Sequence, residues 1–241
     1  EELRLKTVIL TLAGGILAIA GVMNPVPGDP IVIDSGKVAG TVLDSGARAY
    51  FGVPYAAPPL RELRWHAPVP VKSWKGVWNA DTQRAGCVTS AMLPNFESDE
   101  YNNDITMGED CLYLNLWVPA ASKRGGKTPV IVWIHGGGFS NLFANDPSYG
   151  GQEMVKKGII YITVEYRTNV LGFLSHPEAA KESGVNASGN WGLLDQVAAL
   201  KWVQRNIAAF GGDPANVTLI GESAGSMSAS DLQLSPLAKG L

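Results

Sequence analysis

The stretch Gly221-Glu222-Ser223-Ala224-Gly225 decides the fold of this chain. It follows Val217-Thr218-Leu219-Ile220, an aliphatic and β-branched run that is typical of a buried parallel strand. Residues 223–234 are suited to continue as a helix. A Gly-x-Ser-x-Gly pattern between a strand and a helix indicates a nucleophile elbow, in which the serine occupies a strained tight turn. Taken alone, the pattern is also compatible with a chance match in a glycine-rich chain.

A second glycine-rich segment lies upstream, where the apolar run 129–134 leads through His135 into Gly136-Gly137-Gly138. When a serine attacks an ester carbonyl, negative charge develops on the carbonyl oxygen, and backbone N–H groups already aimed at that point stabilise it. Because glycines allow so close an approach, the segment predicts an oxyanion hole. A flexible turn or a phosphate-binding loop is the alternative interpretation.

The alternation of short apolar runs and helical stretches predicts a single α/β domain. Residues 31–53 are predicted to form a β-meander, so the sheet is expected to be mixed and to become parallel. Apolar residues at helical spacing predict a long helix over 191–210, which ends at Gly211-Gly212. Further strands are predicted at 112–118, 130–134, 159–164 and 217–220.

The order of these motifs resembles the N-terminal half of a type-B carboxylesterase, the cholinesterase-like branch of the α/β-hydrolases. The resemblance implies an α/β-hydrolase fold, with a mixed to parallel central sheet and flanking helices, truncated after the nucleophile-elbow helix. It also implies cleavage of small-molecule carboxylic esters through an acyl-enzyme on Ser223. Only the first thirty or so residues fall outside the resemblance, which rests on 49–59, 62–65, 108–115, 136–138, 165–167, 172–174, 189–196, 210–214 and 221–225.

The resemblance also implies roles for residues around the serine. The N–H groups of Gly137, Gly138 and Ala224 match the oxyanion donors. Glu222 matches an acidic residue that lines the active site beside the nucleophile. No cofactor and no metal ion are expected.

The two cysteines flank a polar segment, 92–108, that has little else to hold it. This favours a disulfide between Cys87 and Cys111, which would stabilise the fold by about 3 kcal/mol in the chain-entropy model. Two buried free thiols are the alternative. The family resemblance supports the bridge, and it also pairs Glu109 with Arg64 as an ion pair.

A serine hydroxyl becomes a good nucleophile only when an adjacent imidazole accepts its proton. In this fold the order along the chain is serine, acid, histidine. After Ser223 the chain holds Asp231 but no histidine. His135 is expected to shape the glycine loop, and His66 and His176 are expected at the surface. The triad acid and histidine are therefore expected from a C-terminal half of the protein.

Residues 1–20 resemble a secretory signal, because Arg4 and Lys6 precede an apolar run that ends in small residues. The run is short for a stable membrane span, and a retained signal anchor is the alternative. We therefore expect a secreted or periplasmic protein, in which 21–241 form the N-terminal half of one hydrolase domain.

Composition and context argue against other classes of function. Hydrophobic residues make up 46% of the 241 and charged residues 17%, so the chain has enough apolar side chains to form a core. The net charge is −3, so the sequence has no excess of basic residues that would attract nucleic acid. The segment 121–128 ends in Gly-Lys-Thr like a phosphate-binding loop, but Pro129 and a strand follow where a helix is required.

A non-catalytic cholinesterase-like binding or adhesion protein is the second hypothesis. An intact Ser223 and an intact glycine loop argue against it, because such a protein has no physical need for either. Tyr101 stands where cholinesterases resemble one another in carrying a choline-stacking tryptophan. A tyrosine makes a weaker cation–π contact, which favours a general carboxylesterase.

Overall fold

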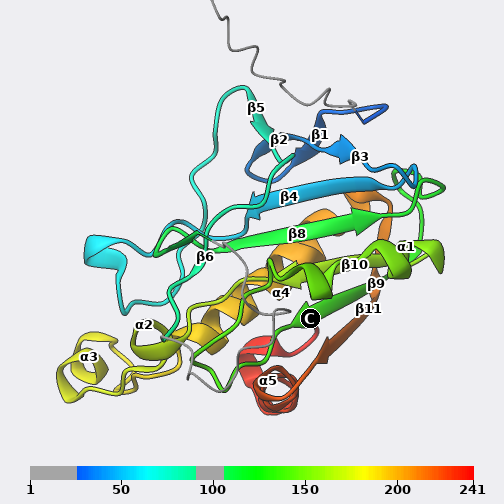
Figure 1. The fold of residues 1–241 in the computed structure, drawn as a ribbon. Helices are drawn as coiled ribbons and strands as arrows, with labels where there is room; N and C mark the ends of the chain where they lie inside the picture. The colour runs from blue at the N-terminus through cyan, green and yellow to red at the C-terminus, as the bar shows by residue number, and fades with distance from the viewer. Residues whose placement is uncertain (1–25, 91–105) are drawn as a thin grey trace, which may run out of the picture.

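The computed structural model describes residues 26–90 and 106–241 (Figure 1). The expected secretory signal at 1–20 and the position of Tyr101 lie outside these described residues. None of the helices within 26–90 and 106–241 combines the length and the apolarity that crossing a bilayer requires.

A six-stranded sheet forms the centre of the fold (Figure 1). Its order is β11 (Gly212–Gly221), β9 (Thr128–Ile134), β10 (Ile160–Val164), β8 (Tyr113–Val118), β4 (Arg48–Pro54) and β3 (Thr41–Val42). The first three strands run parallel, and each of the other three pairs antiparallel with its neighbour. The prediction of a mixed sheet that becomes parallel is confirmed.

The remaining elements are short, apart from two helices. The two longer helices are α4 (Trp191–Asn206) and α5 (Ala224–Leu234). The short helices are α1 (Gln152–Lys156), α2 (Asn169–Phe173) and α3 (Pro177–Glu182), with 3-10 turns η1 (Arg61–Leu63), η2 (Pro147–Tyr149), η3 (Ile207–Phe210) and η4 (Pro236–Ala238). The short strands are β1 (Ile31–Ile33), β2 (Gly36–Ala39), β5 (Val77–Asn79), β6 (Gly86–Cys87) and β7 (Met107–Gly108).

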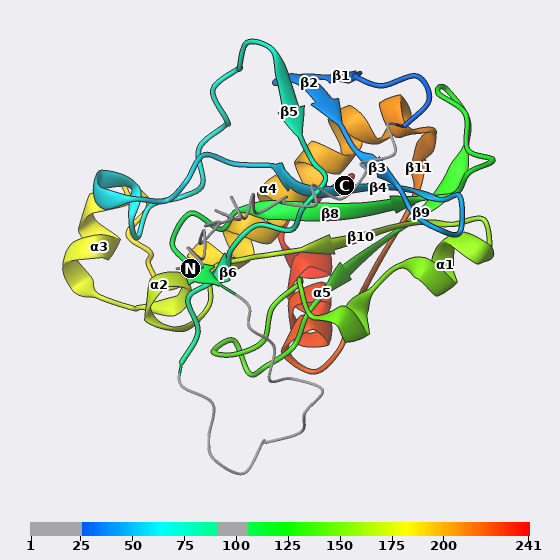
Figure 2. The ribbon, with the colours of Figure 1, turned by 45° about the horizontal axis from the view of Figure 1, so that its top comes forward.

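Each face of the sheet packs against its own apolar cluster, because successive side chains of a strand point to opposite faces. Leu116 of β8 lies in the larger cluster with Leu200 of α4. Its neighbour Trp117 lies in the smaller cluster with Val155 of α1. Figure 2 shows α4 and α1 on opposite sides of the strands. Burial on both faces explains why the central strands are continuous apolar runs.

The helix predicted over 191–210 divides into α4 and the tighter turn η3. Gly211 ends it in the left-handed conformation, at φ 99°, with its N–H donating to Ala208 O at 3.1 Å. This conformation costs little for glycine, which explains the stop signal in the sequence. The chain then enters β11, which leads directly to the serine.

The β-meander predicted over 31–53 is wrong. The strands β1 and β2 pair with each other, but β2 continues into a separate three-stranded sheet by parallel pairing with β5, while β3 and β4 join the central sheet. The chain changes sheets at Gly40, where a Cβ would overlap Ala49 O. Alternating apolar residues indicate a strand but do not identify its partner, and β5 lies far along the chain.

Candidate active site

Ser223 lies at the point where β11 ends and α5 begins. Its backbone angles are φ 50° and ψ −120°, a strained conformation for a residue with a side chain. A Cβ at Gly225 would overlap Ile134 O, and a Cβ at Gly221 would overlap the Gly225 carbonyl. Both glycines of the sequence pattern are therefore required by close backbone approach, and the side chain of Ser223 is exposed.

The backbone after Ser223 turns at once into helix. Glu222 O accepts a hydrogen bond from Gly225 N at 2.7 Å, and Ser223 O accepts from Ser226 N at 2.9 Å. Ala224 is the first residue of α5 and is buried. Its N–H is one of the helix's first donors, which have no partner within the helix. The predicted oxyanion donor thus belongs to the residue that directly follows Ser223, at the start of α5.

The glycine loop lies beside the serine because β9 and β11 are parallel neighbours. Ile134 at the end of β9 pairs in register with Gly221, so both strands end at the same edge of the sheet. A Cβ built on Gly136 would overlap the Glu222 carboxylate and would lie 3.1 Å from Ser223 Cβ. The structure therefore brings together the elbow and the glycine loop, which lie far apart in the sequence.

Hydrogen bonds fix the orientation of the peptide groups in the glycine loop. Gly136 O lies 3.1 Å from His135 Nδ1, and Gly137 O accepts from Ser140 N at 3.0 Å and from Asn141 N at 2.9 Å. Because a trans peptide is planar, these contacts direct the Gly137 and Gly138 N–H groups to the opposite side. Each predicted donor N–H therefore belongs to a peptide group whose carbonyl oxygen has a contact on the opposite side.

His135 packs under the glycine loop, as the sequence predicts. Its ring is fully buried and stacks on Tyr166, with centroids 4.3 Å apart, and Tyr166 Oη donates to His135 O at 2.9 Å. Burial lowers the pKa of His135 to about 4, so the imidazole is neutral at physiological pH. Its Nε2 has no hydrogen-bond partner among the described residues.

The two other histidines have local contacts. His66 Nε2 lies 3.7 Å from Glu182, and its Nδ1 lies 2.9 Å from Arg64 O. His176 Nδ1 accepts from Glu178 N at 3.3 Å, which caps the start of α3. No hydrogen bond joins a histidine to the Ser223 hydroxyl within the described residues.

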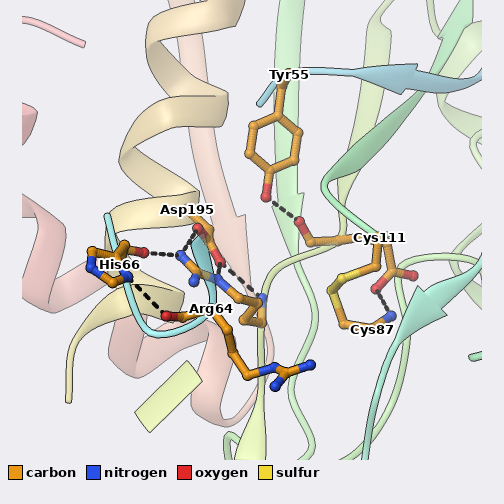
Figure 3. Close-up of polar contacts among 8 residues, drawn as sticks. Tyr55, Arg64, His66, Cys87, Cys111 and Asp195 are labelled. Atoms are coloured by element: carbon orange, nitrogen blue, oxygen red, sulfur yellow. Dashed lines mark hydrogen bonds and ion pairs between the residues drawn. A yellow bond between two sulfur atoms is a disulfide. The ribbon is translucent and has the colours of Figure 1, made fainter. Parts of the chain in front are cut away.

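Cys87 and Cys111 form a disulfide, with Cα atoms 5.0 Å apart (Figure 3). Both side chains are buried. The predicted bridge is confirmed, and the alternative of two free thiols is wrong. Cys87 N donates to the buried Glu165 at 3.4 Å, and Tyr55 Oη donates to Glu165 O at 2.6 Å.

Two ion pairs hold the surroundings of the site. Arg64 and Glu109 meet at two points, Nε–Oε2 at 2.5 Å and Nη2–Oε1 at 2.6 Å. Sequence reasoning missed the second pair, in which Arg167 and Asp195 are fully buried and meet at two points. Both residues fall within the family motifs, but charge pairing between distant segments leaves no local pattern.

Residues 26–90 and 106–241 contain no cluster of three or more histidine, cysteine or acidic residues suited to a metal ion.

Comparison with known proteins agrees with this geometry. The Carboxylesterase family model matches residues 29–241. The fumonisin B1 esterase of Sphingopyxis macrogoltabida is 42% identical over 205 residues, which cover 85% of this chain and 36% of the relative. Liver carboxylesterase 1 of Oryctolagus cuniculus is 41% identical over 228 residues, which cover 89% and 39%.

The solved structure of a thermophilic PNB esterase matches with a TM-score of 0.78 at 40% identity, covering 87% of this chain and 42% of that one. This chain spans about two fifths of the length of these relatives. With an α/β-hydrolase architecture and a family match over nearly all of its length, the chain belongs to the carboxylesterase family.

Proposed function

We propose that this chain supplies the nucleophile and the oxyanion hole of a serine hydrolase that cleaves small-molecule carboxylic esters. One observation carries the proposal: Ser223 sits at φ 50° on a strand-to-helix turn, with the glycine loop packed against its Cβ. A strained backbone persists only where the surrounding structure holds it, and such strain clusters at active sites. Membership of the carboxylesterase family supports the reaction class.

The reaction begins when Ser223 Oγ attacks the ester carbonyl carbon and gives up its proton to a histidine base. Charge on the carbonyl oxygen is stabilised by the N–H groups of Gly137, Gly138 and Ala224. Collapse of the tetrahedral intermediate releases the alcohol, which takes the proton from the histidine, and leaves an acyl-enzyme. Water then attacks the acyl-enzyme in the same way, which releases the carboxylic acid and regenerates Ser223. Glu222 lines this site, with its carboxylate against Gly136.

The triad histidine and acid are assigned to sequence after Leu241, because no histidine follows Ser223 in this chain. We assign residues 21–241 to the N-terminal half of the hydrolase domain and residues 1–20 to a secretory signal. The Cys87–Cys111 disulfide is compatible with export, since such bonds persist in oxidising compartments. The tyrosine at 101 favours a general carboxylesterase over a choline-specific enzyme.

The test is Ser223→Ala in the full-length protein, with Ser230→Ala, on the exposed side of the same helix, as the matched control. Hydrolysis of p-nitrophenyl acetate should fall by several orders of magnitude in Ser223→Ala and stay unchanged in the control. An organophosphate followed by peptide mapping should label Ser223. A label on another serine, or a full-length protein without turnover, would contradict the proposal, and the second result would favour a binding protein.

A further inference from the structure

The loop closed by the disulfide has a short stem, which we define as residues 86–90 and 106–111. Gly86 and Cys87 pair in parallel with Met107 and Gly108, and the Cys87–Cys111 bond closes the stem. The stem packs on the segment that follows the glycine loop. A Cβ at Gly86 would overlap the ring of Phe143, so the two segments are in direct contact.

Ser90 at the end of the stem forms a reciprocal junction with this segment. Its N–H donates to Ser140 O at 2.9 Å. The end of the Asn141 side-chain amide faces two carbonyl oxygens, Ser90 O and Ser140 O, which can only accept; we therefore assign its Nδ2 to this side, where it donates to Ser90 O at 3.1 Å and to Ser140 O at 3.2 Å. At this junction, the backbone of the stem and the backbone after the glycine loop are therefore joined by one backbone hydrogen bond and by the side chain of Asn141.

Asn141 also controls the glycine loop through its own backbone. Its N–H donates to Gly137 O at 2.9 Å, beside the bond from Ser140 N at 3.0 Å. Gly137 has φ 89°, and a Cβ there would overlap Asn141 O. Because Gly137 O and Gly138 N–H belong to one planar peptide group, the position of Asn141 fixes the direction of the Gly138 N–H.

A second contact holds the same two segments at their far end. The buried carboxyl group of Glu165, directly after β10, accepts from Cys87 N at 3.4 Å and from Asn145 N at 3.2 Å. The segment 140–145 is thus held to the stem at both ends. The Glu165 end is buried, whereas the end at Asn141 is half-buried and is held by the Ser90 N–H bond together with the amide bonds of Asn141.

We infer that Asn141 is a positioning residue, which aims the oxyanion donor Gly138 N–H by joining the glycine loop to the stem of the disulfide loop. The inference rests on the proposed function. An oxyanion donor contributes only if it is placed on the developing charge before the reaction, and a small displacement costs a large part of its effect. Asn141 does not touch the substrate. It acts on the rate through the peptide group of Gly137 and Gly138.

The experiment compares Asn141→Leu, which keeps the volume and loses the donor, with Asn141→Ala, which loses both. The full-length protein is used, with Asn79→Leu on the exposed surface of β5 as the matched control. Both Asn141 variants should lower kcat for p-nitrophenyl acetate about tenfold to a hundredfold, with KM unchanged. The affinity for a trifluoromethyl ketone, whose serine adduct places an oxyanion in the hole, should fall by a similar factor.

Hydrogen exchange of the peptide that covers 136–143 supplies a readout that does not depend on catalysis. It should become faster in both Asn141 variants and stay unchanged in Asn79→Leu. If exchange accelerates while kcat and ketone affinity stay unchanged, Asn141 holds the loop but does not position the donor, and the inference is overturned. A loss in Asn141→Ala alone would indicate packing and would also overturn it. Full turnover in Ser223→Ala would instead refute the proposed function. The hydrogen-exchange result would still report whether Asn141 holds the glycine loop, because it does not depend on catalysis.

Discussion

Arg167 and Asp195 form a buried two-point ion pair, with Nε–Oδ2 and Nη2–Oδ1 both at 2.7 Å and side chains 3% and 0% exposed. Arg167 N also donates to Asp195 Oδ2 at 3.1 Å. Arg167 follows β10, and Asp195 lies in the first half of α4. The pair therefore fixes the helix that precedes the nucleophile strand. The same guanidinium donates from Nη2 to His66 O at 2.9 Å.

We expect Asp195→Asn to lower the free energy of unfolding by about 3–5 kcal/mol, because it leaves the Arg167 charge buried without a counter-charge. Urea unfolding of the full-length protein, followed by tryptophan fluorescence, measures this loss. The matched control is Asp34→Asn, which removes the partner of Arg205 from a surface pair with side chains 51% and 34% exposed. The control should cost less than about 1 kcal/mol. Equal losses in the two variants would contradict the prediction.

The disulfide gives a second prediction. Replacing both Cys87 and Cys111 by serine should lower the free energy of unfolding by about 3 kcal/mol, because the loop between them is no longer closed in the unfolded chain. Reduction of the wild type should reproduce this loss, whereas the same reductant should not change the serine variant. In protein recovered from an oxidising compartment, alkylation before reduction should find no free thiol. Two alkylated cysteines in the native protein would contradict the prediction.

The sequence predicts the elbow and the glycine loop well because each is a local requirement of the backbone. Gly221 and Gly225 avoid contacts within a few residues of the serine or on the neighbouring strand, and such needs leave a fixed spacing in the sequence. The strands of the central sheet are likewise predicted closely, because burial on both faces produces continuous apolar runs.

Pairings across long sequence distances could not be predicted in this way. The parallel pairing of β2 with β5 depends on which edges meet after folding. The contacts of Glu165 with Cys87 and Asn145 also join distant segments. A carboxyl group after a buried strand gives no sign in the sequence of whether it faces solvent or backbone N–H groups. Only the family motifs around 165–167 single out this region.

Glu165 predicts an unusual dependence of stability on pH. Burial raises the pKa of Glu165 to about 8, although backbone N–H groups of Cys87, Asn145 and Ala144 favour the carboxylate. The folded protein therefore keeps a proton that the unfolded chain, with an ordinary carboxyl, releases above pH 4.5. Unfolding then releases a proton, so stability should fall as pH rises from about 4.5 to about 8, by at most about 1.4 kcal/mol per pH unit, and level off above.

Glu165→Gln isolates this effect, because glutamine keeps the neutral form at every pH. Relative to Glu165→Gln, the wild type should lose free energy of unfolding as the pH rises across this range. Asp195, whose pKa is also raised by burial, is present in both proteins and cancels. Glu62→Gln, on an exposed turn, serves as the control and should show a constant difference. A constant difference for Glu165→Gln would show that its carboxyl titrates in its ordinary range.

The last prediction concerns a polypeptide of residues 21–241 expressed alone. No histidine is bonded to the Ser223 hydroxyl in the described structure, so general-base activation is absent and only the oxyanion hole contributes. Turnover of p-nitrophenyl acetate should be near background. The strand β11 is an edge of the six-stranded sheet, and Val217 and Leu219 border a hollow of about 740 Å³ beside α5. An apolar edge strand is a template for pairing between chains, so the polypeptide should self-associate.

Size-exclusion chromatography and the esterase assay on the same preparation test both parts. We expect oligomers or aggregates, with a rate that Ser223→Ala does not lower further. A second variant, Thr218→Lys, places a charge at an exposed position of β11 and should shift the polypeptide toward the monomer, because charged residues on edge strands oppose pairing. A soluble monomer with esterase-level turnover that Ser223→Ala abolishes would contradict the prediction. It would mean that a base exists within this chain, and His176 would be the histidine to examine, because His135 is buried and neutral under the glycine loop.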